Sequence, residues 1–154
     1  MIRPVTEILF FHLQRQPLDK VLPILLARSG ERGWRAIVKA GSEERLEALD
    51  ERLWTFADDS FLPHGTDRDP DPAGQPILLT LADANSNGAQ VLFLVEGAAM
   101  PTEVAGYERV TILFDGADEE AVAVARVTWG EVKRAGHEAS YWQESPAGRW
   151  EKKA

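Results

Sequence analysis

The sequence contains no cysteine among its 154 residues. This absence excludes disulfide bonds, thiolate catalysis and cysteine-based zinc sites, and it is typical of proteins from a reducing compartment. The three histidines, His12, His64 and His137, lie in different segments without the paired spacing of metal ligands. We therefore expect neither a metal site nor a cofactor that depends on one.

Long hydrophobic runs are also missing. The apolar stretches are a handful of residues long, far short of the roughly 20 residues that cross a bilayer. The first residues lack the apolar core and small-residue cleavage site of a secretory signal. We therefore expect a soluble, cytoplasmic protein without a membrane partner.

Basic residues are scarce relative to acidic ones. The chain has 17 Lys and Arg against 25 Asp and Glu, a formal net charge of −8. Binding to phosphate backbones depends on clustered cations that release counterions. Any role with nucleic acid is therefore expected to be indirect.

The glycine-rich motifs that bind phosphate are absent. No Gly-x-Gly-x-x-Gly follows the first apolar run, and neither a P-loop nor a Gly-x-Ser-x-Gly elbow occurs. Asp67, Asp69 and Asp71 alternate like a calcium loop, but Pro72 and Leu78 occupy the required glycine and glutamate positions. A solvated acidic loop is the better interpretation, and no catalytic residue can be named.

The apolar pattern predicts one α/β domain over residues 1–154. Short apolar runs predict strands at residues 5–13, 34–40, 77–81, 90–95, 109–114 and 137–143. Helical spacing predicts three helices, one after Pro17 to about residue 30, one from Ser42, and one from Asp118 to about Gly136. Pro23 should bend or delay the first helix.

The connections predict how the strands pair. Helices between strands favour parallel pairing, whereas the close-set strands at 77–81 and 90–95, with a turn at 85–88, favour an antiparallel part. We expect a mixed, mostly parallel sheet flanked by helices. A long irregular loop is expected at 58–76 and a polar C-terminal tail at 144–154.

Trp54 stands off the apolar stripe of its predicted helix, and Phe61 follows it in the loop. The stripe itself consists of Leu46, Leu49 and Leu53. Two interpretations remain open. The two aromatic side chains either anchor the loop to the domain or form an apolar surface for a partner.

The last predicted helix carries Arg126 and Lys133 at the edge of an apolar face, beside Trp129. The cations either extend along a core tryptophan or form a small cationic rim that suits a carboxylate or an acidic peptide. Spacing alone favours the first interpretation.

The chain resembles the chi subunit of bacterial DNA polymerase III. The resemblance rests on residues 8–13 (Ile-Leu-Phe-Phe-His-Leu), 49–54 (Leu-Asp-Glu-Arg-Leu-Trp) and 59–64 (Asp-Ser-Phe-Leu-Pro-His). Further matches lie at 87–89, 113–116, 125–126, 135–137 and 141–142. Together they span nearly the whole chain in the family's order.

The resemblance implies a non-catalytic accessory subunit without a cofactor. It implies a three-layer, Rossmann-like topology without a nucleotide-binding motif, in agreement with the missing glycine loops. Chi links the clamp-loader complex to the single-stranded-DNA-binding protein by binding that protein's acidic C-terminal tail, which ends in Pro-Phe. In many members chi also pairs with a psi subunit.

The resemblance also implies which residues bind the tail. It places four side chains at the site, which are Trp54, Phe61, Arg126 and Trp129. Gly130 departs from the family, because this position is often a lysine. Lys133 is the nearest replacement for the missing charge, and a weaker or more salt-sensitive grip is expected.

Two alternatives remain at this point. A small α/β enzyme or nucleotide-binding protein is common in this fold class, but it needs a phosphate site or an acid/base pair. A chi-fold scaffold that does not bind the tail is the second, and Gly130 is the residue that favours it.

Overall fold

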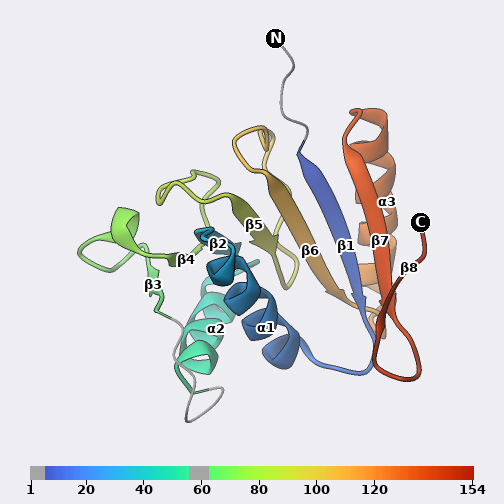
Figure 1. Cartoon of the computed structure of the whole chain (residues 1–154), viewed down its shortest axis with the longest axis horizontal. Coiled ribbons are helices and arrows are strands. Elements are labelled where there is room, and N and C mark those ends of the chain that lie inside the picture. The colour runs from blue at the N-terminus through green and yellow to red at the C-terminus, as the bar shows by residue number, and fades with distance from the viewer. Residues whose placement is uncertain (1–5, 56–62) are drawn as a thin grey trace.

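A computed structural model describes residues 6–55 and 63–154 and is built on one eight-stranded sheet (Figure 1). The strand order is β3-β4-β2-β5-β6-β1-β7-β8, and every pairing is parallel except β7 with β8. The elements in chain order are β1 (Glu7–Leu13), α1 (Leu18–Glu31), β2 (Ala36–Lys39), α2 (Glu43–Thr55), β3 (Gly65–Thr66), η1 (Pro72–Gly74), β4 (Ile77–Thr80), β5 (Val91–Leu94), β6 (Arg109–Asp115), α3 (Glu119–Arg134), β7 (Glu138–Glu144) and β8 (Trp150–Lys152). The predicted α/β class, with a mixed and mostly parallel sheet, is confirmed.

Two hydrophobic layers cover the two faces of the sheet. In β1, Leu9, Phe11 and Leu13 face one layer with the apolar residues of α1 and α2. The alternate residues Ile8 and Phe10 face the other layer with α3. This division follows from strand geometry, since successive side chains point to opposite faces. Helices α1 and α2 therefore lie on one side of the sheet and α3 on the other.

The helix ends are those that the sequence predicts. Asp118 caps α3 by accepting hydrogen bonds from the backbone N–H groups of Glu120 and Ala121. Ser42 accepts one from Arg45 at the start of α2. Pro23 does not delay α1, which begins at Leu18 and contains this proline at its sixth position. None of the described helices is long and apolar enough to span a bilayer.

The predicted antiparallel pairing of the middle strands is wrong. β4 and β5 do not pair with each other; they flank β2, each in parallel. Both strands are buried along their whole length, which is typical of interior parallel strands. The connection between them is held by buried Asn87, whose Nδ2 donates to the carbonyls of Ala36 (3.1 Å) and Gln75 (2.9 Å).

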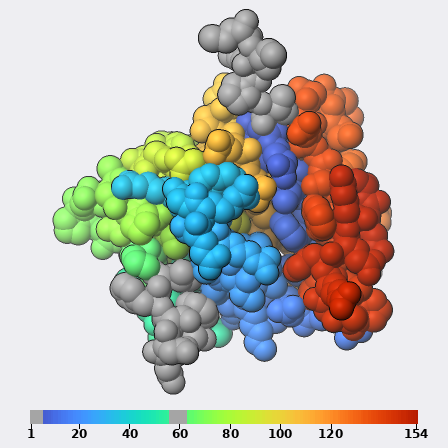
Figure 2. Space-filling view, viewed as in Figure 1, coloured from blue at the N-terminus to red at the C-terminus, as the bar shows by residue number. Residues whose placement is uncertain are grey.

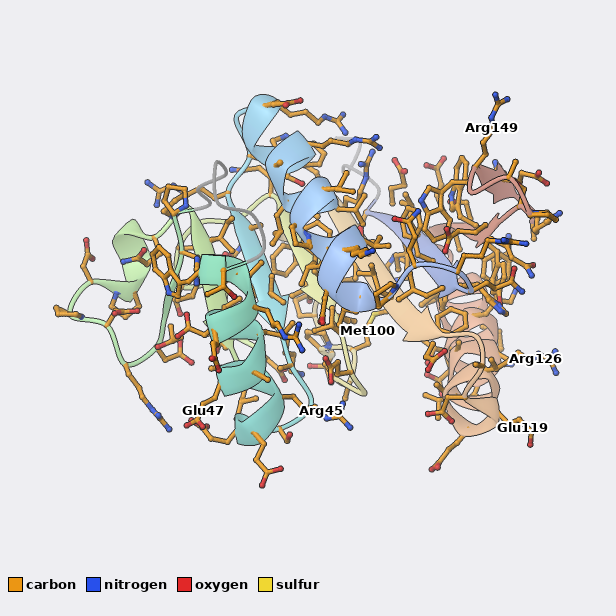
Figure 3. The ribbon with its side chains drawn as sticks, turned by 90° about the horizontal axis from the view of Figure 1, so that it is seen from below. Arg45, Glu47, Met100, Glu119, Arg126 and Arg149 are labelled. Carbon is orange, nitrogen blue, oxygen red and sulfur yellow. The ribbon has the colours of Figure 1, made fainter. Side chains whose placement is uncertain are left out.

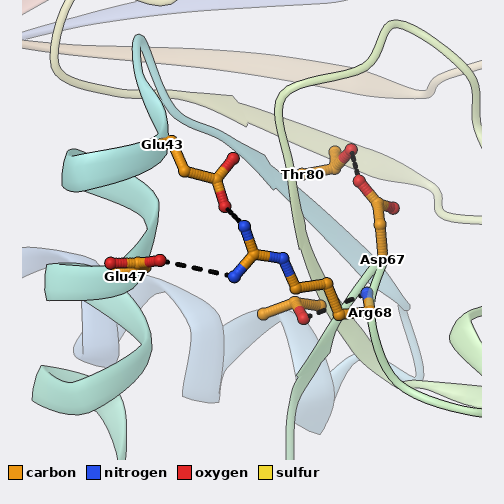
Figure 4. Close-up of polar contacts among 6 residues, drawn as sticks. Glu43, Glu47, Asp67, Arg68 and Thr80 are labelled. Atoms are coloured by element: carbon orange, nitrogen blue, oxygen red, sulfur yellow. Dashed lines mark hydrogen bonds and ion pairs between the residues drawn. The ribbon is translucent and has the colours of Figure 1, made fainter.

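The predicted loop at 58–76 is more ordered than expected in its described part. Residues 63–76 contain β3 and η1. Arg68 forms ion pairs with Glu43 and Glu47 of α2, the latter at 3.3 Å, and Asp67 accepts a hydrogen bond from Thr80 at 2.5 Å (Figure 4). The composition of this segment indicated a flexible loop. These contacts hold the described part in one conformation and offset the entropy lost in ordering it.

The predicted polar tail at 144–154 contains strand β8, which pairs antiparallel with β7. Trp150 lies edge-on to the ring of Phe11, with 4.9 Å between ring centroids. β8 has three residues, two of them charged. It is too short for an alternation of apolar and polar residues to identify it as a strand in the sequence. One aromatic contact and the backbone ladder hold it in place.

Candidate functional site

The candidate site is centred on Trp129, on the side of the sheet that α3 covers. The Trp129 ring is edge-on to Phe10 at 5.3 Å and to Tyr141 at 6.1 Å between centroids. It is only partly buried. The indole is therefore fixed by two neighbouring rings while part of its surface stays accessible to a ligand.

Two predicted cations accompany Trp129 on α3. The Lys133 ammonium lies 5.6 Å from the centre of the Trp129 ring, within the range of a cation–π contact. Arg126 is exposed, and Figure 3 shows its side chain extending away from α3. The structure thus brings Arg126, Trp129 and Lys133 together along one side of a single helix.

Arg134 is a further cation of this site that sequence reasoning missed. A Cβ atom on Gly130 would lie 3.6 Å from Nη1 of Arg134, so the guanidinium occupies the space beside the missing side chain. Positions 126, 130 and 134 recur at the four-residue spacing of one helix face, and this signal was available. Within the described residues, none of Arg126, Lys133 and Arg134 forms an ion pair.

A polar pair, His12 and Tyr141, lies under this surface. His12 Nδ1 is 2.6 Å from the Tyr141 hydroxyl. Burial and then the Arg126 charge lower the pKa of His12, against the opposing effect of Asp115. Burial raises the pKa of Tyr141, although Arg126 opposes this. Both groups are therefore neutral at pH 7, and His12 adds no positive charge to the cations of α3.

Trp54 lies on α2, on the other side of the sheet. Its side chain is 48% exposed, and its ring is 4.0 Å from that of His64, tilted by 36°. His64 is buried, and its Nε2 lies 2.9 Å from a carboxylate oxygen of Asp50. Trp54 is thus an exposed aromatic residue that rests on a buried, anchored histidine.

The structure does not bring Trp54 together with the α3 residues. The leucines of α2 pack with Leu9 and Phe11, whereas Val132 and Trp129 of α3 pack with Phe10. These β1 residues point to opposite faces, and the sheet separates the two surfaces. Phe61 lies outside the described residues. Trp54 and the α3 residues therefore do not line one slot, because sequence order does not indicate which face a helix covers.

Comparison with known proteins identifies the family. The sequence pattern described as "DNA polymerase III chi subunit, HolC" matches residues 5–140. The chain belongs to this chi subunit family. A similar protein from Rickettsia prowazekii (strain Madrid E), described as "Probable DNA polymerase III subunit chi", is 24% identical over 164 residues, which cover 98% of this chain and 94% of that protein. Membership of the chi family indicates an accessory subunit of a replicative DNA polymerase.

The polar groups at the carboxyl ends of the strands are the other place where an α/β protein could have a site. Lys39 at the end of β2 donates to Asp83 at 2.5 Å and to the carbonyl of Ala99 at 2.7 Å. Thr80 at the end of β4 is bonded to Asp67. Among the described residues, no three His, Asp or Glu side chains could hold a metal ion together. These polar groups therefore satisfy one another at the ends of β2 and β4.

Proposed function

We propose that this chi family member links the clamp-loader complex of DNA polymerase III to the single-stranded-DNA-binding protein by binding that protein's acidic C-terminal tail along α3. The observation that carries the proposal is a set of three cations around Trp129 on a chain with a net charge of −8. Carboxylates of the tail would be attracted to this surface and repelled by most of the rest.

The chemistry of the tail matches these side chains. Arginines bind carboxylates through two parallel hydrogen bonds, and Arg126 and Arg134 are both exposed. The accessible part of Trp129 offers an apolar contact to the terminal phenylalanine. Lys133 adds charge above the same ring. The charge absent at Gly130 is thus supplied by Arg134 as well as by Lys133.

A linking protein needs a second surface that the tail leaves uncovered. The Trp54 side of the sheet is separated from α3 by the sheet itself. Contact with the clamp loader, directly or through a psi subunit, can then occur while the tail is bound.

The test is a titration of the protein with a labelled acidic peptide that ends in Pro-Phe. The free carboxylate is compared with the C-terminal amide, each at low and moderate salt. We expect dissociation constants of about 1–100 μM for the free acid, with weaker binding after amidation or at higher salt. Binding of neither peptide would contradict tail binding and leave a chi-fold scaffold.

Variants assign the site. We expect Arg126→Ala and Arg134→Ala each to weaken binding about three- to tenfold, and Lys133→Ala to have a smaller effect. Arg28→Ala on α1 is the matched control, since it removes an exposed arginine from the opposite side of the sheet. If Arg28→Ala loses affinity for the peptide and Arg126→Ala does not, the tail does not bind along α3. The enzyme alternative instead predicts that ATP or NAD raises the melting temperature.

A further inference from the structure

A groove lies on the side of the sheet opposite α3. It is bounded by α1 on one side and by the β7–β8 hairpin on the other, and its volume is about 470 Å³. Figure 2 shows β6 and β1 between α1 and the hairpin on this side of the molecule. The volume is within the range of ligand-binding pockets.

The groove exists because this face of the sheet has two separate covers. Helix α1 covers part of it, and Trp142 and Trp150 of the hairpin cover Phe11, with ring centroids 6.4 Å and 4.9 Å apart. Between the covers, the floor is formed by buried apolar side chains such as Leu9, Phe11 and Phe93. An apolar floor of this kind favours a ligand with an apolar side chain.

Positive charge surrounds this apolar floor. Arg28 extends from α1, Arg32 caps the C-terminus of α1, and Arg109 extends from β6. Of the described residues that line the groove, Glu31 carries the one carboxylate, and Glu7 beside the groove pairs with Arg109. Most of the chain has the opposite balance, with a net charge of −8. The groove is therefore a local cationic site on an acidic protein.

The three guanidinium groups are incompletely paired. Arg28 is exposed and forms no ion pair within the described residues, and Arg32 lies 4.1 Å above the Trp34 ring. Arg109 lies 3.6 Å from Glu7, but its buried Nε has no acceptor in the described chain. Donors without acceptors beside an apolar groove indicate an anionic ligand, because an unmet buried donor is costly.

The groove lining distinguishes a peptide from a nucleotide. Among the described residues that line it, two carry hydroxyl groups, Ser29 and Thr111, and Ser29 already donates to the carbonyl of Leu25 at 3.0 Å. A nucleobase would lose hydrogen bonds with water on entering and recover few of them. An apolar side chain with neighbouring carboxylates loses nothing on the floor and gains contacts at the rim.

We propose that this groove binds an acidic segment of a partner polypeptide by inserting one apolar side chain between α1 and the hairpin while carboxylates contact Arg28, Arg32 and Arg109. Arg28 and Arg32 are one helical turn apart, so successive acidic groups of an extended chain can reach both. The site is independent of tail binding on α3, because the sheet lies between them.

The probe is a labelled peptide with one phenylalanine flanked by aspartates, acetylated and amidated so that it has no terminal carboxylate. Full-length protein is titrated with it at low salt, beside a peptide with alanine in place of phenylalanine and a single-stranded oligonucleotide. We expect binding of the phenylalanine peptide, at least about fivefold weaker binding of the alanine peptide, and no oligonucleotide binding. No binding of the phenylalanine peptide, or preference for the oligonucleotide, overturns the proposal.

Variants then place the probe. We expect Arg28→Ala to weaken its binding about three- to tenfold and Arg28→Glu to weaken it further, whereas Arg134→Ala leaves it unchanged. The Pro-Phe peptide should show the reverse dependence. If Arg134→Ala abolishes binding of the probe and Arg28→Glu does not, the groove proposal is overturned. The proposal of tail binding on α3 is unaffected by this result. Arg28 is exposed, so these variants are expected to fold, and thermal unfolding verifies this.

Discussion

Glu144 is the buried carboxylate at the end of β7, and it holds the connection between β1 and α1. One of its oxygens accepts backbone hydrogen bonds from Gln14, Arg15 and Gln16 at 3.2–3.4 Å, and the other accepts one from the Gln16 side chain at 3.2 Å. Burial alone would raise the pKa of Glu144, but these hydrogen bonds together lower it below the ordinary value of 4.5. Its charged form therefore stabilises the fold.

The sign of the pH dependence follows. The unfolded chain binds a proton at Glu144 more readily than the folded chain, so this stabilisation is complete above about pH 4.5 and is lost as the pH falls through the lower folded pKa. We expect Glu144→Gln to reduce the free energy of unfolding by about 1–2 kcal/mol at pH 7 and by less near pH 3. Urea unfolding at both pH values measures this. Glu138→Gln, at the exposed start of β7, is the control, and an equal loss in both variants would exclude the mechanism.

Among the elements, β8 has three residues, yet it contributes both to the hydrophobic core and to the groove. It contributes Trp150 to the cover of Phe11 and to one wall of the groove. We expect removal of residues 148–154 to lower the free energy of unfolding by about 2–4 kcal/mol, because Phe11 loses one of its two aromatic neighbours and β7 becomes an edge strand. Urea unfolding followed by circular dichroism measures the loss.

Trp150→Phe is the matched variant for this truncation. It keeps the strand and an aromatic ring, and we expect it to retain most of the stability. If the truncated chain unfolded at the same urea concentration as the full chain, β8 would not contribute to the core as its contacts indicate.

Elements were predictable where their own residues determine them. The Asp118 cap, the stripe of Leu46, Leu49 and Leu53, and the apolar runs were sufficient to place helices and strands. The pairing of the strands was not predictable. Strands such as β4 and β5 are buried along their length, and they carry no alternation of polar and apolar residues that indicates which strand lies beside them. Asn87 resembled a turn residue, yet it is buried as a bridge between β2 and the segment that precedes β4.

The candidate site likewise has a part that the sequence predicts and a part that it does not. Helix periodicity alone places Arg126, Trp129 and Lys133 together, and the structure agrees. The position of Trp54 depends on which sheet face α2 covers, a tertiary property that no local pattern encodes. Arg134 could have been found from its four-residue spacing to Gly130 and Arg126, and the structure places its guanidinium beside Gly130.

At the scale of the whole molecule, charge is distributed unevenly. The net charge is −8, yet cations gather on α3 and around the groove on the opposite side. This distribution favours contact with acidic polypeptides at these two surfaces and disfavours contact with phosphate backbones. The two cationic surfaces lie on opposite sides of the sheet.

This distribution predicts how the protein reaches DNA. We expect no detectable binding to a labelled single-stranded oligonucleotide at physiological salt, because clustered lysine and arginine on one face are too few to release many counterions. We expect binding to appear when the same oligonucleotide is coated with single-stranded-DNA-binding protein, and to disappear when that protein lacks its C-terminal tail. Fluorescence anisotropy and analytical ultracentrifugation measure both steps. If the protein binds the bare oligonucleotide directly, and this binding weakens steeply with salt, the cations of α3 bind DNA and not an acidic peptide.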